Sequence, residues 1–277
     1  MDFEERDGVA VQPGGRWLKT VVAGNPGPLT LDGTRTYLLG GDPCVVVDPG
    51  PDLADHLDAL EVGLGAAELG AICITHHHAD HAAGAAELAL RSGALLAALP
   101  ESAELAGLEP PEIPLSPGAS VVFGGGHLDV IPAPGHCPDH VCFHWPEAGA
   151  LFTGDTILGE GSSLIAPPDG DVAAYLSTLE RLAQLELTVI YPGHGPLIDE
   201  PAEKIDEYIK HRLLREMQVL EALTAGADTP AQIRARVYPD LDARLLSAAE
   251  GSVLAHLTKL MSEGRVRTAD DRYLPVG

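Results

Sequence analysis

Short apolar segments alternate with segments of helical periodicity along the first 200 residues. Residues 43–47 are almost wholly apolar and end at Asp48-Pro49-Gly50, which predicts a buried strand followed by a turn. Residues 69–75 form a second β-rich run that leads directly into His76. Helical spacing predicts helices over 52–61, with Asp52 as a candidate N-cap, and over 82–91.

The middle of the chain has the pattern of a meander of short strands. Strands are predicted over four segments separated by Gly and Pro, namely 120–123, 127–131, 141–145 and 150–153. An amphipathic helix is predicted over 171–183 and a strand over 187–191, which ends at Pro192-Gly193-His194.

The character of the sequence changes after Pro201. Residues 202–223 predict a long helix, and Thr229-Pro230 begins a second helix with Thr as the cap. A third helix is predicted over 244–263, and the last residues predict a hairpin around Asp270-Asp271. Helices followed by a hairpin suggest a winged-helix-like domain, so the chain is predicted to divide into residues 1–200 and 201–277.

The charge of the chain is strongly negative and unevenly distributed. The formal net charge is −24, and residues 1–200 alone hold 6 Lys or Arg against 29 Asp or Glu. An acidic body repels phosphate backbones, so weak nonspecific affinity for nucleic acid is expected.

The four cysteines and the amino terminus carry no signal of export. No CxxC pair is present, and the first residues are acidic without an apolar h-region. No apolar run approaches the ~18 residues of a membrane span. A cytoplasmic protein without a membrane partner is therefore expected, and its oligomeric state cannot be predicted from these features.

Candidate metal ligands are concentrated in four separate segments. In the run 75–81, THHHADH, the four candidate ligands His76, His78, Asp80 and His81 lie within six residues, directly after a predicted strand. Pro134-Gly135-His136, Gly154-Asp155 and Gly193-His194 each place one ligand beside a glycine near a strand end. A single His-rich tract can bind metal incidentally, but four such segments predict a built site. Imidazole favours zinc, whereas the carboxylates would also suit manganese or iron.

In this order the motifs HxHxDH, PGH, GDT and PGHG resemble those of the metallo-β-lactamase-fold hydrolases. The resemblance implies an α+β fold, an αββα sandwich with two metal ions at one edge. It implies that His76, His78 and His136 hold the first ion, that Asp80, His81 and His194 hold the second, and that Asp155 bridges both. Asp48 and His140 resemble residues that support the ligands in this family, and His77 is a non-ligand by pattern.

Residues 152–161, 192–196 and 204–212 further resemble the branch around beta-lactamase-like protein 2, which includes an endoribonuclease and several thioesterases. Members of this branch have a winged-helix-like C-terminal domain, in agreement with the helices and hairpin predicted above. The resemblance therefore extends over nearly the whole chain.

These features predict a dinuclear metal-dependent hydrolase that attacks its substrate with a metal-bridging hydroxide. Asp80 is expected to orient the nucleophile and His194 to stabilise the developing oxyanion, and Gly159, Ser162 and Ser163 are candidates for the substrate pocket. The acidic body favours a small ester or thioester as substrate.

Two alternatives remain open at this point. One is cleavage of single-stranded RNA, for which the candidate phosphate contacts are Arg212, Arg215, Arg234, Arg236, Arg265 and Arg267. The other is a non-catalytic regulator that binds DNA through its winged helix. Intact ligand motifs argue against the regulator, as does the absence of a net-basic helix over 244–263.

Overall fold

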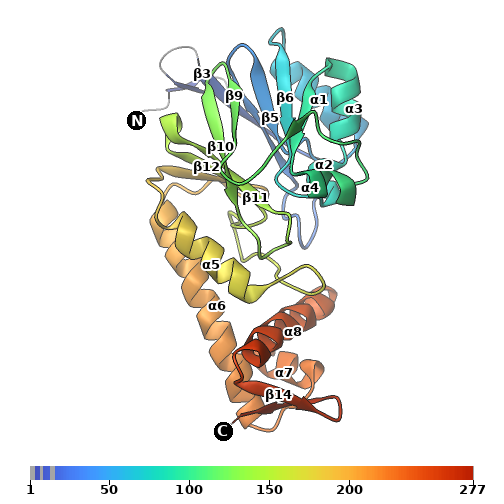
Figure 1. Cartoon of the computed structure of the whole chain (residues 1–277), viewed down its shortest axis with the longest axis vertical. Coiled ribbons are helices and arrows are strands. Elements are labelled where there is room, and N and C mark those ends of the chain that lie inside the picture. Colours follow the sequence, from blue (N-terminus) through green and yellow to red (C-terminus); the bar gives the residue numbers. More distant parts are fainter. Residues whose placement is uncertain (1–3, 7–8, 13–15, 277) are drawn as a thin grey trace. The chain divides into compact units, whose positions relative to one another are not determined.

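The first of two compact units in the chain contains two β-sheets. The computed structural model describes residues 4–6, 9–12 and 16–276, and its contacts define a first unit of Met1–Ala133, Asp139–Gly161 and Glu186–Pro201. The larger sheet has the strand order β1-β2-β3-β4-β5-β6-β7-β8 (Figure 1). Its strands are β1 (Glu4–Arg6), β2 (Val9–Gln12), β3 (Arg16–Val22), β4 (Arg35–Leu39), β5 (Cys44–Val47), β6 (Leu69–Cys73), β7 (Leu95–Ala98) and β8 (Ile113–Pro114). Neighbours are antiparallel up to β5 and parallel from β5 to β8.

The smaller sheet of this unit is built from the predicted meander. Its order is β13-β12-β11-β10-β9, antiparallel except for the parallel pair of β12 and β13. The strands are β9 (Ser120–Phe123), β10 (Gly126–Pro132), β11 (Val141–Trp145), β12 (Ala150–Gly154) and β13 (Val189–Pro192), and a short 3₁₀ helix, η1 (Pro146–Ala148), joins β11 to β12. The predicted strands over 120–153 are thus confirmed to within two residues.

A core of aliphatic and aromatic side chains joins the two sheets. Alternation along β4 sends Tyr37 and Leu39 into this core, whereas Leu38 points to the opposite face. In the smaller sheet, Phe143 and Trp145 contribute to the same core and are almost completely inaccessible to solvent. The alternation of side chains along a strand therefore determines which of them enter the core between the sheets and which point to the opposite face.

Truncating Phe143 should destabilise the protein strongly, because its ring lies in the core between the two sheets. Phe143→Ala removes a fully buried ring and leaves a cavity, so the free energy of unfolding should fall by about 3–5 kcal/mol. Val122→Ala is a suitable control, because Val122 lies in the same sheet but is 78% exposed. Urea unfolding of both variants measures the difference, and equal effects would contradict this assignment of faces.

Helices cover the other face of the larger sheet. Leu57 and Leu60 of α1 (Ala54–Leu64) and Leu88 of α3 (Ala85–Ser92) pack with Leu38 and Val46 in a second core. Two short helices, α2 (Ala79–Ala82) and α4 (Pro100–Leu105), complete the helices of this unit among the described residues. Figure 1 shows α1 and α3 side by side along the sheet.

The second unit consists mainly of helices. It contains Pro134–Pro138, Ser162–Leu185 and Ala202–Gly277. Its elements are α5 (Val172–Leu182), α6 (Pro201–Thr224), α7 (Pro230–Val237), the 3₁₀ helix η2 (Ala243–Leu245), α8 (Leu246–Ser262) and the hairpin of β14 (Val266–Ala269) and β15 (Arg272–Pro275). The helices and hairpin predicted after residue 201 are therefore present, and none of the described helices is long and apolar enough to cross a membrane.

Local capping agrees with the sequence at two helices and differs at a third. Thr229 caps α7 through its hydroxyl, and the Asp171 carboxylate accepts hydrogen bonds from the first turn of α5. The predicted cap at Asp52 is wrong, because α1 begins one residue later than that cap requires. Leu53 occupies the N-cap position there and offers no side-chain acceptor.

Candidate metal centre

The candidate ligands follow the carboxyl ends of strands. His76 to His81 come after β6, His136 after β10, Asp155 after β12 and His194 after β13. Gly154, the residue before Asp155, has φ of +45°, and a Cβ there would lie 2.5 Å from the Thr75 hydroxyl. Only glycine fits this turn without displacing Thr75. The glycine of the GDT motif therefore brings Asp155 close to the His-rich turn.

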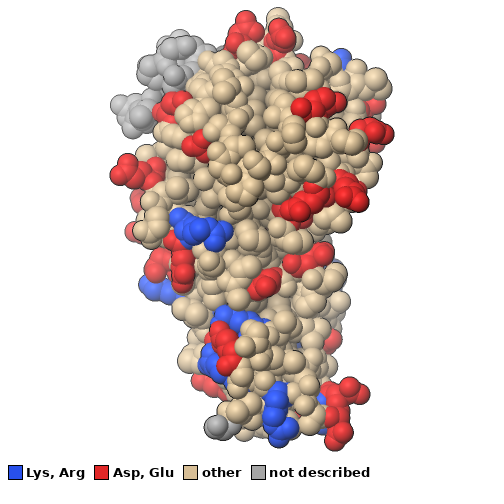
Figure 2. Space-filling model, viewed as in Figure 1, with Lys and Arg blue, Asp and Glu red and all other residues tan. Residues whose placement is uncertain are grey.

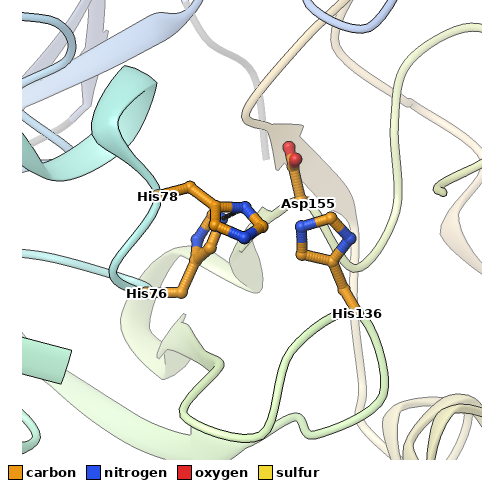
Figure 3. A group of neighbouring side chains, drawn as sticks. All are labelled: His76, His78, His136 and Asp155. Atoms are coloured by element: carbon orange, nitrogen blue, oxygen red, sulfur yellow. Dashed lines mark hydrogen bonds between the residues drawn. The ribbon is translucent and has the colours of Figure 1, made fainter. Parts of the chain in front are cut away.

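One group of candidate ligands consists of His76, His78, His136 and Asp155 (Figure 3). One ligand atom from each residue lies within 4.8 Å of the corresponding atoms of the others. The Thr75 hydroxyl donates to Asp48, so it can only accept from Nδ1 of His76, at 2.9 Å. The lone pair of His76 is therefore on Nε2, which lies 3.0 Å from Nδ1 of His78.

A second group consists of Asp80, His81 and His194. Their ligand atoms lie close together, with 3.2 Å between the Nε2 atoms of His81 and His194 and 3.3 Å from His194 Nε2 to Asp80 Oδ2. Asp155 also approaches this group, because its Oδ1 lies 3.3 Å from His81 Nε2 and 3.2 Å from His194 Nε2. Asp155 is thus the residue shared by the two groups.

The hydrogen bonds of the two imidazoles show that this group suits a cation. His81 Nδ1 donates to the Asp48 carboxylate at 2.8 Å, and His194 Nδ1 donates to the Gly33 carbonyl at 3.2 Å. Because each Nδ1 proton is used in one of these hydrogen bonds, each Nε2 carries a lone pair. The two Nε2 atoms face each other and the carboxylates of Asp80 and Asp155. Ligand atoms around a tetrahedral zinc ion with bonds of ~2.0–2.1 Å are ~3.3 Å apart, which matches these separations.

The charges of the group favour a bound cation for a second reason. Burial lowers the pKa of His194, but hydrogen bonds to Asp155 and Asp80 outweigh it and raise that pKa to about 9. For His81, burial is likewise opposed by Asp155 and Asp48, and its pKa is raised well above the usual value. The carboxylates therefore stabilise positive charge at this position, which either protons or metal ions can supply.

Asp48 supports the second group through its hydrogen bonds. Its side chain is buried and accepts three of them, from the Thr75 amide at 2.7 Å, the Thr75 hydroxyl at 2.9 Å and His81 Nδ1 at 2.8 Å. The carboxylate fixes the start of the His-rich turn and the tautomer of His81 at the same time. The supporting position expected for Asp48 therefore has a geometric basis.

His140 contacts the other side of the centre. Its Nε2 accepts the Asp155 amide at 3.1 Å, and its ring is stacked on that of His76 with centroids 4.6 Å apart. Nδ1 of His140 lies 3.3 Å from the Thr156 hydroxyl. His140 therefore contacts the ring of His76, a member of the first group, and the backbone amide of Asp155, the shared residue.

Sequence reasoning missed a hydrogen-bonded pair at the His-rich turn. The pattern predicts only that His77 is a non-ligand, yet its Nδ1 lies 2.8 Å from the buried carboxylate of Asp139, which also accepts the His77 amide at 3.0 Å. His77 and His78 also approach Cys137 closely enough to form a third candidate group. Asp139 stands three residues after His136 in the sequence, but nothing local indicated its partner.

The three candidate pocket residues lie in different surroundings. The Gly159 amide donates to the His194 carbonyl at 2.9 Å, so Gly159 adjoins the ligand turn. Ser162 is exposed, whereas Ser163 is buried and its carbonyl accepts a hydrogen bond from Arg212. The hydrogen bond of Gly159 therefore places it beside a turn that carries a candidate ligand.

A family model decides the classification. The model of the metallo-beta-lactamase superfamily matches residues 29–194, which is more than half of the chain. The chain belongs to the metallo-beta-lactamase superfamily, a family of metal-dependent hydrolases. The model of the beta-lactamase associated winged helix domain matches residues 229–273. The predicted family, fold and winged helix are thereby confirmed.

Relatives with similar sequences extend over most of the chain. It is 35% identical to a beta-lactamase-like protein 2 homolog of Caenorhabditis elegans, covering 89% of this chain and 84% of the relative. The homolog of the same name in Drosophila melanogaster is 34% identical, with 90% of each chain covered. The predicted branch is therefore confirmed as well.

Solved structures show the same fold. The metallo-beta-lactamase family protein TTHA1429 of Thermus thermophilus matches with a TM-score of 0.78 and 25% identity, covering 96% of this chain and all of that protein. TTHA1623, solved in a di-iron-bound form, is 30% identical with a TM-score of 0.54, covering 66% of this chain and 96% of that protein.

Proposed function

We propose that this hydrolase holds two divalent metal ions and cleaves a small carboxylic ester or thioester. The observation that carries the proposal is the position of Asp155, whose carboxylate belongs to the first ligand group and lies 3.2–3.3 Å from both imidazoles of the second. A carboxylate placed in this way can bind two ions at once.

The proposed ligand assignment divides the residues by group. The first ion is bound by His76, His78 and His136, the second by Asp80, His81 and His194, and Asp155 is shared. Zinc is proposed because imidazoles predominate among the ligands. The di-iron form of TTHA1623 makes iron the alternative to test, together with manganese, by metal analysis of the purified protein.

Two bound ions would supply a hydroxide at neutral pH and polarise the substrate's carbonyl oxygen. The chain's own groups then orient the reaction. The Asp80 side chain is 29% exposed, more than the 15% of Asp155, and we propose that it positions the nucleophile. His194, beside it, is proposed to stabilise the developing oxyanion, and Gly159 to line the pocket with Ser162 and Ser163.

Charge supports a small substrate over a polyanion. Among the charged residues on the visible surface of the first unit, Asp and Glu are more frequent than Lys and Arg (Figure 2), and the first 200 residues hold 29 acidic and 6 basic residues. Such a surface repels a phosphate backbone at long range. A neutral or weakly charged ester avoids this repulsion.

Most arginines that would contact RNA already have partners. Arg212 is buried, Arg215 bonds to Gln218, Arg234 pairs with Glu250 and Arg265 pairs with Glu216. Among the described residues only Arg236 and Arg267 of the six are exposed and make no ion pair. Nonspecific affinity for RNA grows with the number of phosphates that the protein neutralises. Two arginines without ion pairs would therefore contribute little affinity.

Parallel assays test the proposal. Metal-loaded protein is tested on an acyl thioester, a nitrophenyl ester, a phosphodiester and single-stranded RNA. We expect turnover of the thioester or ester, and Asp80→Ala should lower kcat/KM by about 10²-fold or more, because it removes a proposed ligand of the second ion and the group that positions the nucleophile. Asp55→Ala, an exposed aspartate of α1, is the control and should retain activity.

The outcomes separate the substrate classes. Cleavage of RNA alone, strongly weakened by added salt, would replace the ester proposal by an RNA-cleaving one. Absence of turnover on all four substrates by protein shown to contain two metal ions would refute the proposed substrate class.

A further inference from the structure

A backbone carbonyl, that of Leu164, is a hydrogen-bond partner of the His136 ring. Its Nδ1 lies 2.8 Å from the Leu164 oxygen, and a carbonyl can only accept, so Nδ1 carries the proton. Nε2 is then the atom left to bind metal. A ligand histidine commonly fixes its tautomer through such a bond, and loss of the partner lowers metal affinity by about 10–100-fold.

The carbonyl of Leu164 belongs to a segment without regular secondary structure, residues 161–170. Its position therefore depends on contacts from other elements. Arg212 of α6 provides one, because its guanidinium donates to the carbonyl of Ser163, the residue before Leu164. The same guanidinium lies over the ring of Tyr175, 5.0 Å from its centroid.

Tyr175 in turn holds the turn that carries His136. Gly135 has φ of +141°, and a Cβ at that position would lie 2.4 Å from the Tyr175 Cα, so the turn packs tightly against α5. Thr178, one turn further along α5, donates its hydroxyl to the Pro134 carbonyl at 2.8 Å. Arg212 thus contacts the two elements, the segment at Ser163 and the ring of Tyr175, that border His136.

The burial of Arg212 is costly, and no carboxylate of the described residues compensates its charge. Arg212 is 2% exposed, pairs with no carboxylate of the described residues, and its Nε has no hydrogen-bond partner there. Two histidines that interact with Arg212 supply no negative charge. Burial and nearby cations, Arg212 among them, lower the pKa of His256 to about 3 and that of His211 to about 4. Burying an unpaired charge is strongly unfavourable, and hydrogen bonding to one carbonyl and a ring contact offset this only partly.

We infer that Arg212 is a positioning residue for the first metal ion: it fixes the Ser163–Leu164 backbone so that the Leu164 carbonyl orients the His136 imidazole. This gives α6 a role in metal binding, although α6 carries none of the proposed ligands. The inference rests on the proposed metal function, specifically on His136 as a ligand.

Arg215 provides a closely matched control on the same helix. It also lies over a tyrosine ring, 4.5 Å from the centroid of Tyr238, and its guanidinium also reaches a backbone carbonyl, that of Val237 at 3.5 Å. Those partners belong to the end of α7 and not to the segment at Leu164. Truncating Arg215 therefore removes similar contacts without touching the support of His136.

The experiment compares Arg212→Met, Arg212→Lys and Arg215→Met with the unchanged protein. Each is titrated with Co²⁺, whose absorption reports both sites, and the affinity of each site is measured together with the free energy of unfolding in urea. Proton NMR of the Co²⁺ forms adds a direct readout, the solvent exchange of the His136 Nδ1 proton.

We expect Arg212→Met to lower the affinity of the first site by about 10–100-fold, to leave the second site within about 3-fold, and to accelerate exchange of the His136 proton. Arg212→Lys should restore part of the affinity, and Arg215→Met should change neither site. Equal weakening of both sites, or unchanged affinity and exchange in Arg212→Met, would overturn the inference. If the unchanged protein binds fewer than two ions, the proposed metal function fails instead.

Discussion

Replacing Asp155 with alanine should remove at least one metal ion per chain and lower kcat/KM by about 10³-fold or more. Asp155 is the one carboxylate of the described residues that approaches both ligand groups, so its loss leaves each ion short of a ligand. A 10³-fold loss corresponds to about 4 kcal/mol of transition-state stabilisation. Metal analysis of the purified variant and steady-state kinetics on the best ester or thioester measure the two effects.

The control for this substitution is Asp199→Ala. Asp199 follows β13 in sequence and is exposed, so its replacement should leave metal content and kinetics close to those of the unchanged protein. A fully active Asp155→Ala protein that retains two ions would show that the shared carboxylate has no part in metal binding or catalysis.

Replacing Asp48 should affect both stability and metal binding. Asp48→Ala leaves three buried donors without their acceptor, two from Thr75 and one from His81, and places alanine at φ of 51°. The free energy of unfolding should fall by about 3–5 kcal/mol, because each unsatisfied buried group costs about 1–3 kcal/mol. Affinity for the second ion should fall by about 10–100-fold, since His81 loses the bond that fixes its tautomer.

Asp48→Asn separates the backbone effect from the hydrogen bonds. Asparagine tolerates positive φ and keeps one acceptor oxygen, so its loss of stability should be smaller, whereas its loss of metal affinity should persist. Asp58→Ala is the control, because Asp58 is 65% exposed and its pair with Arg91 should contribute less than about 1 kcal/mol. If urea unfolding and metal titration gave Asp48→Ala and Asp58→Ala the same values, the supporting role of Asp48 would be wrong.

Local patterns were sufficient for most secondary structure. The apolar run before Asp48 forms β5, and the Gly-punctuated segments over 120–153 form four strands of one sheet. These segments could be predicted because alternation and turn residues act over a few neighbouring positions. The cap predicted at Asp52 is wrong because Leu53 occupies the N-cap position and its carbonyl accepts the first helical hydrogen bond, from the Leu57 amide.

The candidate ligand residues were also visible in the sequence, since metal ligands are of few types and these residues occur on glycine-flanked turns near strand ends. Their supporting partners were not. Asp139 beside His77 and the Leu164 carbonyl beside His136 are separated from them by 62 and 28 residues. A backbone carbonyl carries no side-chain signature at all, so no motif could have identified the one that orients His136.

The sequence by itself determined part of the secondary structure, including β5, β6, the four strands over 120–153 and the helices and hairpin after residue 201, but not β1 to β4, β7 or β8. It also determined the family and the candidate ligands, because these depend on residue type and short spacing. The sequence resemblance already implied that Asp155 is shared, and the tertiary structure added its distances to His81 and His194. Only the tertiary structure decided which candidate ligand atoms face one another and that Arg212 is buried against Ser163 and Tyr175. The physical reason is that hydrogen-bond acceptance and burial belong to pairs of groups that meet only after the chain has folded.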